Sequence, residues 1–330
     1  DITATDGVGL RFNNADGVYN FGGNNTMNGG DAAVDIINGS DGTFTWTDLD
    51  ISNPNGHALN INSGTATVTL GADSQIEQGN AFNALRVVDH SGGTITINGT
   101  INATNGNGVL FNNADGTYAL NGSTTLNGGN AALDIVNGSA GDFTIQNMDI
   151  TNPTGIGVSI QDLDGGNVSF INGSVATNAT APTVDINGGF GNINFLGSDV
   201  TQTGTGLVVD VTDFGNGSSN ILFDAAGSIT ATTAGNLGIR LNNNDANITL
   251  ASANIANTST HAIRSNNSSG QINLSNVDIS NAGGDGVRIA NLDGTLQFQQ
   301  GSSIDGAAGN GINVIGGGAA TEVQILGTSG

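Results

Sequence analysis

The chain of 330 residues contains no cysteine and no lysine, and five arginines are its only strongly basic residues. The lack of cysteine excludes disulfide bridges and thiolate metal sites. A formal net charge of −23 argues against nucleic acid and anionic membrane surfaces as partners. No apolar run approaches the roughly 18 residues of a membrane helix, so we expect no membrane insertion by this segment.

In place of these features the chain has a repeat, a short apolar motif that returns about every 24 residues. A period of this length marks a solenoid, in which each repeat, or rung, buries its apolar face against its neighbours. The first apolar residue of each rung, here called the ladder residue, falls at Leu10, Val34, Leu59, Leu85, Val109, Leu133, Val158, Val184, Leu207, Ile239, Ile263, Val287 and Ile312.

Each rung contains three segments in which apolar and polar residues alternate. In the second rung these segments are residues 34–36, 44–46 and 49–51, and Gly/Asn/Asp clusters separate them. Alternation with period two predicts short strands with one buried face. We therefore expect an all-β, right-handed, single-stranded parallel β-helix of about 13 rungs of about 24 residues, with three parallel sheets.

A longer repeat is superimposed on the rungs. Residues 12–17 return as residues 111–116, an offset of 99. The predicted organisation is one continuous β-solenoid, 1–330, with four-rung blocks at 10–108, 109–206 and 239–330 and an interpolated rung at 207–238.

The two ends of the sequence are mutually compatible. Residues 325–330 followed by residues 1–6 read as an ordinary rung, similar to the internal run 225–233. Because open solenoid ends expose apolar columns and strand edges, we expect a segment of a longer solenoid, or a unit that stacks end to end. The alternative is a finite domain whose caps were trimmed.

The Gly/Asn/Thr/Ser/Asp-rich, cysteine-free composition and the ladder together resemble bacterial surface β-helices. The resemblance is to autotransporter passengers and large repetitive adhesins, within the pectin-lyase-like class, and it covers the whole chain. It implies secretion and an extracellular or cell-surface location, but no particular receptor. Since the fold hosts adhesins, lyases, hydrolases and tailspikes, the resemblance indicates architecture better than function.

Arg240, Arg264 and Arg288 each follow the ladder residue of consecutive rungs. We expect them to point outward, about 5 Å apart. Such a stripe is a candidate contact for a sulfated or uronic polysaccharide, or for the aspartate column of a neighbouring copy. The alternative is a solvated stripe whose charge is relieved by nearby turn aspartates.

The longer loop of the interpolated rung is a second candidate contact, through Asp213, Phe214 and Asn216. Trp46 is expected in the core, because apolar residues stand at its position in the other blocks. The asparagine runs at 13–14, 112–113 and 242–244 are expected to form stacked amide ladders.

Enzymatic activity is not expected. Asp48 with Asp50, and Asp162 with Asp164, have the spacing of paired glycosidase carboxylates, but no basic residue or aromatic cluster converges on them. The Asp-Asp pair, Gly-His-Gly turn and Arg-x-Lys motif of the fold's galacturonan hydrolases are absent. The three histidines show no metal-ligand spacing, so no cofactor is expected, with Ca²⁺ bridging of surface aspartates a weak exception.

These observations favour a structural extracellular segment of a bacterial surface fibre, coat or giant repetitive surface protein. The expected partners are copies of itself, end to end or side by side, or adjoining repeats of a longer chain. The first alternative is an adhesin stalk or passenger that binds host or matrix glycans through the arginine stripe or the loop. The second alternative is a polysaccharide lyase or hydrolase.

Overall fold

The computed structural model describes residues 1–30, 33–128, 131–232 and 235–326. The chain is an all-β parallel β-solenoid of about 13 rungs, each of about 25 residues. The fold class expected from the sequence is thereby confirmed. The described residues form no helix, and hence no helix long and apolar enough to span a membrane. Residues 327–330, at one end of the expected tail-to-head junction, lie outside the described residues.

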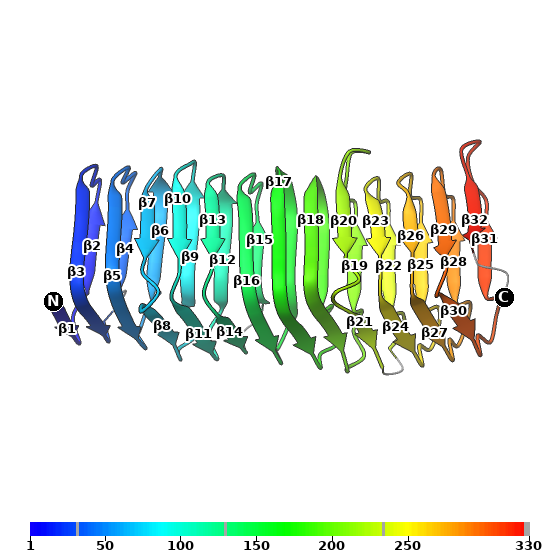
Figure 1. Ribbon diagram of the computed structural model, residues 1–330, viewed down its shortest axis with the longest axis horizontal. Coiled ribbons are helices and arrows are strands. Elements are labelled where there is room, and N and C mark those ends of the chain that lie inside the picture. The colour runs from blue at the N-terminus through cyan, green and yellow to red at the C-terminus, as the bar shows by residue number, and fades with distance from the viewer. Residues whose placement is uncertain (31–32, 129–130, 233–234, 327–330) are drawn as a thin grey trace. The chain divides into compact units, whose positions relative to one another are not determined.

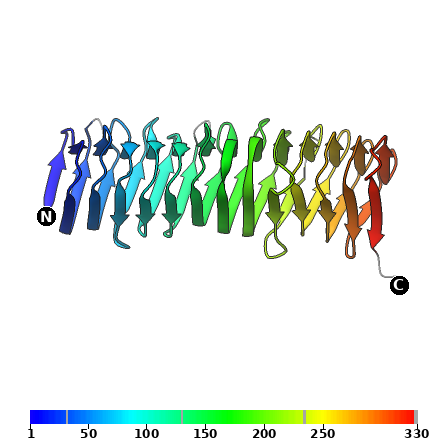
Figure 2. The same cartoon turned by 90° about the horizontal axis from the view of Figure 1, so that it is seen from above.

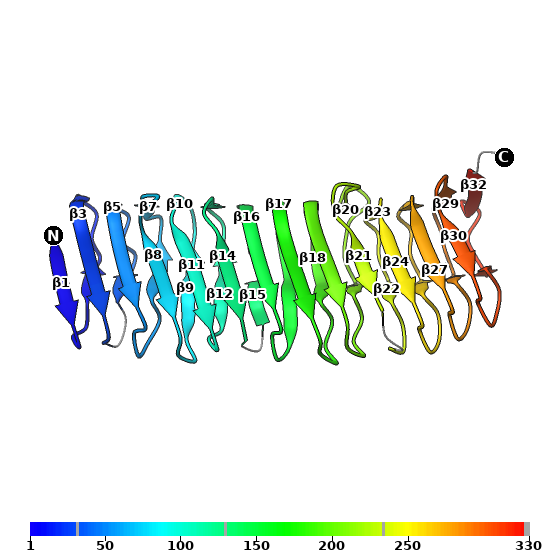
Figure 3. The same ribbon diagram turned by 60° about the horizontal axis from the view of Figure 1, so that its bottom comes forward.

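The chain divides into two compact units. Unit 1 comprises Asp1–Thr154 and Leu163–Ile171, and unit 2 comprises Gly155–Asp162 and Asn172–Gly330. In each unit the strands of successive rungs lie side by side in parallel register (Figure 1). The same arrangement is visible from above (Figure 2) and after a tilt that brings the strands β8 and β11 forward (Figure 3).

Unit 1 has three faces, and strands of successive rungs pair on each of them. The first face, which carries the ladder residues, contains β2 (Leu10–Asn13), β4 (Val34–Ile37), β6 (Leu59–Gly64), β9 (Asn83–His90), β12 (Gly108–Ala114) and β15 (Ala131–Val136). The second face contains β7 (Thr67–Leu70), β10 (Thr94–Ile97), β13 (Thr117–Leu120) and the first parts of β3 (Val18–Asn28), β5 (Thr43–Ser52) and β16 (Asp142–Thr151). The third face contains β1 (Ile2–Thr5), β8 (Gln75–Gln78), β11 (Thr100–Thr104), β14 (Thr124–Asn127) and the last parts of β3, β5 and β16.

Unit 2 repeats the three faces, with the long strand β18 (Val184–Gln202) running through all of them. After β18 the first face continues with β19 (Val209–Thr212), β22 (Ile239–Asn242), β25 (Ile263–Asn266), β28 (Val287–Ala290) and β31 (Ile312–Ile315). The second face continues with β20 (Asn220–Phe223), β23 (Asn247–Leu250), β26 (Ile272–Leu274), β29 (Thr295–Gln299) and β32 (Glu322–Leu326). The third face continues with β21 (Ile229–Ala231), β24 (Ala253–Ala256), β27 (Val277–Ser280) and β30 (Ser303–Asp305). The remaining strand, β17 (Ile156–Thr177), has residues in both units.

The core is built from alternate residues of every strand. On β4 and β5 the side chains of Val34, Ile36, Phe44 and Trp46 are all 0% exposed, and each contributes roughly 1.5–3 kcal/mol by burial. Trp46 stacks on Phe21 with ring centroids 4.8 Å apart. The expectation of a core tryptophan is confirmed, although its indole Nε1 has no hydrogen-bond partner among the described residues.

An aromatic cluster occurs twice at the 99-residue offset. The rings of Tyr118 and Phe143 are stacked with centroids 4.8 Å apart, and the ring of Phe111 lies across them at 4.9 and 5.0 Å. The residues 99 positions earlier form the same arrangement, with their stacked pair at 4.9 Å. Sequence identity at this offset therefore preserves a specific packing arrangement.

The corner after the first face is the most regular feature of the surface. Its residue, four positions after the ladder residue, has φ between 48° and 72° in every rung. Asn, Asp and Gly tolerate this left-handed backbone better than other residues, which explains their predominance there. The corner residues are Asn14, Asn38, Ser63, Asp89, Asn113, Asn137, Asp162, Gly188, Asp213, Asn243, Asn267, Asn291 and Gly316.

Hydrogen bonds link these corner side chains from one rung to the next. Asn291 Nδ2 donates to Asn267 Oδ1 (2.9 Å), and Asn267 Nδ2 donates to Asn243 Oδ1 (3.2 Å). Asn113 donates to Asp89 in the same way at 2.9 Å. The expected stacked amides are found at Asn242 and Asn243 and at Asn13, whose Oδ1 accepts from Asn38 Nδ2 at 2.9 Å, whereas Asn113 bonds to a carboxylate.

One ladder position differs from the sequence expectation. Val184 pairs with Val209, and Val209 pairs with Ile239, so Val209 and not Leu207 is the ladder residue of the interpolated rung. The run Leu207-Val208-Val209 is apolar throughout, and a shift of two residues keeps the same face of a strand buried. Apolar periodicity alone therefore could not distinguish the two registers.

Candidate functional site

The three predicted stripe arginines lie in one column on the first face of unit 2. Arg240 pairs in register with Arg264, and Arg264 pairs with Arg288. The two rungs before them place Asp185 and Asp210 in the same column. The predicted alignment of the arginines is confirmed, and the structure adds two carboxylates at one end of the column.

Arg240 is held by the carboxylate of the preceding rung. Its Nε donates to Asp210 Oδ1 at 2.7 Å, and its Nη2 contacts Asp210 Oδ2. This two-point arrangement is the strong form of a guanidinium–carboxylate pair. The Arg240 side chain is 45% exposed, whereas that of Asp210 is only 5% exposed. Burial, and then repulsion from Asp210, raise the pKa of the adjacent Asp185 to about 6, against a smaller opposing effect of Arg240.

Arg288 also has a carboxylate neighbour. Its Nη1 lies 3.7 Å from Asp285 Oδ2, and the Asp285 carboxylate further accepts hydrogen bonds from Asn310 and Asn313. Burial alone would raise the pKa of Asp285, but these hydrogen bonds outweigh it and the pKa is lowered. Asp285 is thus an ionised group that neutralises much of the charge of Arg288.

His261 lies beside this pair and is neutral near pH 7. Its Nδ1 accepts a hydrogen bond from the backbone N–H of Asp285 at 2.9 Å, so the ring proton is carried by Nε2. Burial lowers the pKa of His261, against the opposing effect of the Asp285 carboxylate. His57 accepts from the backbone N–H of Asn83 in the same manner, which identifies this contact as a recurring way to connect rungs.

Arg264 is the exception in the column. Its side chain is exposed. Within the described ranges its guanidinium makes neither a hydrogen bond nor an ion pair. Its two neighbours in the column are arginines, so register supplies no carboxylate on either side.

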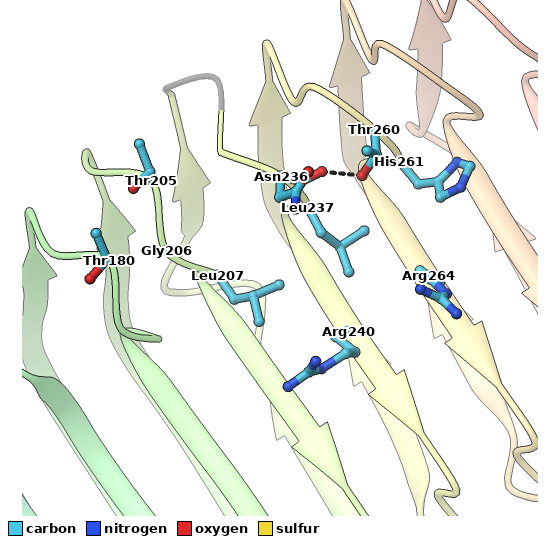
Figure 4. A pocket seen from close by; sticks show the side chains of 10 residues that line it. All are labelled: Thr180, Thr205, Gly206, Leu207, Asn236, Leu237, Arg240, Thr260, His261 and Arg264. Carbon is cyan, nitrogen blue, oxygen red and sulfur yellow. Dashed lines mark hydrogen bonds between the residues drawn. The ribbon is translucent and has the colours of Figure 1, made fainter.

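A hollow of about 410 Å³ lies on this part of unit 2. Thr and Asn residues lie toward one end of the hollow and the two arginines toward the other, with Leu207 and Leu237 between them (Figure 4). Thr260 Oγ1 donates to the backbone carbonyl of Asn236. The lining residues are Thr180, Thr205, Gly206, Leu207, Asn236, Leu237, Arg240, Thr260, His261 and Arg264.

The equivalent column in unit 1 places polar and acidic residues between its arginines. Arg11 pairs in register with Asp35, Asp35 with Asn60, and Asn60 with Arg86. Arg86 Nη1 donates to Asn60 Oδ1 at 2.9 Å, and Asn60 Nδ2 donates to Asp35 Oδ1 at 2.7 Å. Arg86 thus has a hydrogen-bond partner in the adjacent rung, whereas Arg11, like Arg264, makes neither a hydrogen bond nor an ion pair within the described ranges.

Of the two carboxylate pairs considered for catalysis, Asp48 and Asp50 lie in a different hollow, and Asp162 and Asp164 do not line it. Asp48 and Asp50 line a depression of about 560 Å³ together with Asp73, which sequence spacing did not bring into the group. Burial raises the pKa of Asp48, and the charges of Asp50 and Asp73 raise it further. Asn24 Nδ2 donates to Asp50 Oδ2 at 3.4 Å. Across the described part of the chain, no three His, Cys, Asp or Glu side chains are placed to hold a metal ion.

The predicted loop contact requires a correction at Phe214. Its side chain is 0% exposed and belongs to the core, because the left-handed backbone at Asp213 turns the chain back toward the interior. Asp213 and Asn216 are exposed. Asp213 Oδ1 accepts from Asn243 at 2.8 Å, and Asn216 Oδ1 accepts from the hydroxyl of Ser219 at 3.2 Å.

Comparisons with protein-family models, with curated protein sequences and with solved structures each gave no match to this chain. The class that the structure defines is therefore the β-solenoid, and the site must be interpreted from its own residues.

Proposed function

We propose that this chain is a structural segment of an extracellular bacterial fibre, coat or giant repetitive surface protein. The observation that carries the proposal is the repetition of the left-handed corner, with its side-chain hydrogen bonds, in one rung after another. A feature that recurs at every rung serves to keep rungs in register. A reaction would need its catalytic groups once.

The proposed partner is another layer of the same architecture. On β32 the apolar side chains of Val323, Ile325 and Leu326 are 39%, 68% and 49% exposed. Val323 and Ile325 pair with Leu296 and Phe298 on β29, which are only 0% and 8% exposed, whereas Leu326 pairs with the partly exposed Gln299. An adjoining rung, from a second copy or from a neighbouring repeat, would bury this surface in the same way.

The composition supports a location outside the cell. The chain has no thiol to oxidise, and a net charge of −23 keeps neighbouring molecules apart in solution. Both properties suit an exposed, long-lived surface structure, and the lack of cysteine is part of the composition that resembles bacterial surface β-helices.

Antibodies raised against residues 1–330 test the proposed location. Intact cells of the native source should bind the antibody, and added protease should remove the signal without lysing the cells. Antibody binding that appears only after lysis would contradict an extracellular role. A periplasmic or cytoplasmic marker, probed on the same cells, is the control for intactness.

A further inference from the structure

The charge on the first face of unit 2 is unevenly distributed among its arginines. Arg240 is paired with Asp210 and Arg288 lies beside Asp285. Arg264, between them, has no carboxylate within ion-pair distance among the described residues. Arg11 also lacks such a partner among the described residues, but Arg264 combines an unpaired guanidinium with a position at the edge of a hollow.

We propose that this hollow binds a sugar that carries a single carboxylate, such as a hexuronate residue of an acidic glycan, and that Arg264 holds the carboxylate. The inference goes beyond the structural role and does not depend on it. Of the three arginines in the predicted stripe, only Arg264 is proposed to contact the ligand directly.

Arg264 suits a carboxylate because its planar guanidinium offers parallel N–H donors that match the two carboxylate oxygens. Arg240 lies at the same edge, but its guanidinium is already engaged by Asp210. Arg240 therefore contributes a positive electrostatic field that attracts the ligand carboxylate, and Arg264 supplies the free N–H donors that bind it.

The ligand is expected to carry few charges. Aspartates 185 and 210 precede the arginines in the column, and Asp285 follows on the other side. A densely sulfated chain that extended past Arg264 in either direction would meet these carboxylates. A single anionic group placed at Arg264 avoids that repulsion.

The rest of the hollow suits a sugar. The hydroxyls of Thr180 and Thr205 line it and make no hydrogen bonds within the described ranges, so they can bond to sugar hydroxyls. Leu207 and Leu237 offer an apolar patch between these polar groups and the arginines (Figure 4). A volume of about 410 Å³ falls within the range of roughly 300–1,000 Å³ typical of small-ligand sites.

Titration of the purified 330-residue chain with sodium D-galacturonate, followed by calorimetry and amide NMR shifts, tests the proposal. Binding should be saturable, should shift amides of β22 and β25, and should weaken as salt is added. Arg264→Met should weaken it at least about tenfold. Arg264→Lys should retain part of it, because the charge remains while the two-point geometry is lost.

Arg288→Met is the matched control, because Arg288 stands next in the column but does not line the hollow. It should bind like the parent protein, and circular dichroism should show that each variant is folded. Equal losses for Arg264→Met and Arg288→Met would overturn the proposal, as would no saturable binding by the parent protein. Binding of sodium acetate as tight as that of galacturonate would reject the sugar, since the carboxylate alone would account for the affinity. Equally tight binding of neutral methyl galactoside would reject the role of Arg264.

Discussion

Removal of the Arg240 guanidinium should destabilise the solenoid much more than removal of the same group from Arg264. The perturbation is Arg240→Met, which keeps the apolar stem and deletes the charge. It leaves the Asp210 carboxylate, only 5% exposed, without its cationic partner and beside the second carboxylate of Asp185.

The magnitude follows from the burial of the pair. Breaking a fully buried pair is destabilising by about 3–5 kcal/mol, and an exposed pair contributes about 0–1 kcal/mol. With one partner 5% and the other 45% exposed, we expect a loss of about 2–3 kcal/mol for Arg240→Met. Arg264→Met should change the free energy of unfolding by less than about 0.5 kcal/mol, because the guanidinium of Arg264 has no such partner.

Urea unfolding followed by far-UV circular dichroism measures both variants. Because solenoid rungs can unfold in parts, hydrogen exchange of the β19 and β22 amides should be recorded as well. The double variant Asp210→Asn/Arg240→Met should recover most of the loss, since the buried charge is gone. Equal stabilities of Arg240→Met and Arg264→Met would refute the assignment of Asp210–Arg240 as a stabilising pair.

Three further predictions follow from the same structure. Asp185→Asn should stabilise the protein by about 1–2 kcal/mol at pH 8. The rise in the pKa of Asp185 corresponds to roughly 3 kcal/mol, and partial exposure to solvent reduces this value. The folded-state pKa of Asp185 is raised to about 6, so the advantage should shrink as pH falls from about 7 to 4.5; an advantage independent of pH in urea unfolding would contradict this. Burial lowers the pKa of His90, whose Nδ1 and Nε2 contact Tyr118 Oη and a backbone carbonyl at 2.8 and 3.0 Å. Stability contributed by neutral His90 should therefore be lost as pH falls below about 6.5, and the unfolding midpoint of His90→Gln should show a shallower decline over this range than that of the parent. Asn267→Val should be destabilising by about 1–2 kcal/mol, because φ is 52° at Asn267. Asn254→Val, at an exposed position of the extended strand β24, should be nearly neutral. Equal thermal shifts of the two variants would count against backbone strain at Asn267.

The repeating architecture could be predicted because each ladder residue is followed by alternating residues and a turn. The core position of Trp46 followed in the same way, from apolar residues at its repeat positions. These features depend on periodicity within the sequence, which the folded chain preserves from rung to rung.

The register of the interpolated rung was harder to predict, and the error affected the site. With Leu207 as ladder residue, the column position falls on Val208, whereas the observed ladder residue Val209 places Asp210 there. For this reason the sequence did not reveal Asp210 as the partner of Arg240. The corner provides the missing signal, because Asp213 stands four residues after Val209, as corner residues do in the other rungs.

The partners of the other residues depend on three-dimensional contacts that spacing does not reveal. Asp285 precedes its strand by two residues and reaches both His261 and Arg288. Phe214 stands in a segment rich in turn residues but is buried. In both cases the backbone of a corner, and not the apolar period, decides where the side chain lies.

Cryo-electron microscopy of the native material from which the chain comes tests the proposed structural role most directly. Filaments or sheets outside the cell, with β-solenoid rungs stacked in continuous density through and beyond residues 1–330, are the predicted result. Isolated particles whose exposed β32 surface is covered by a different fold, or solvated, would contradict the role as a fibre or coat segment.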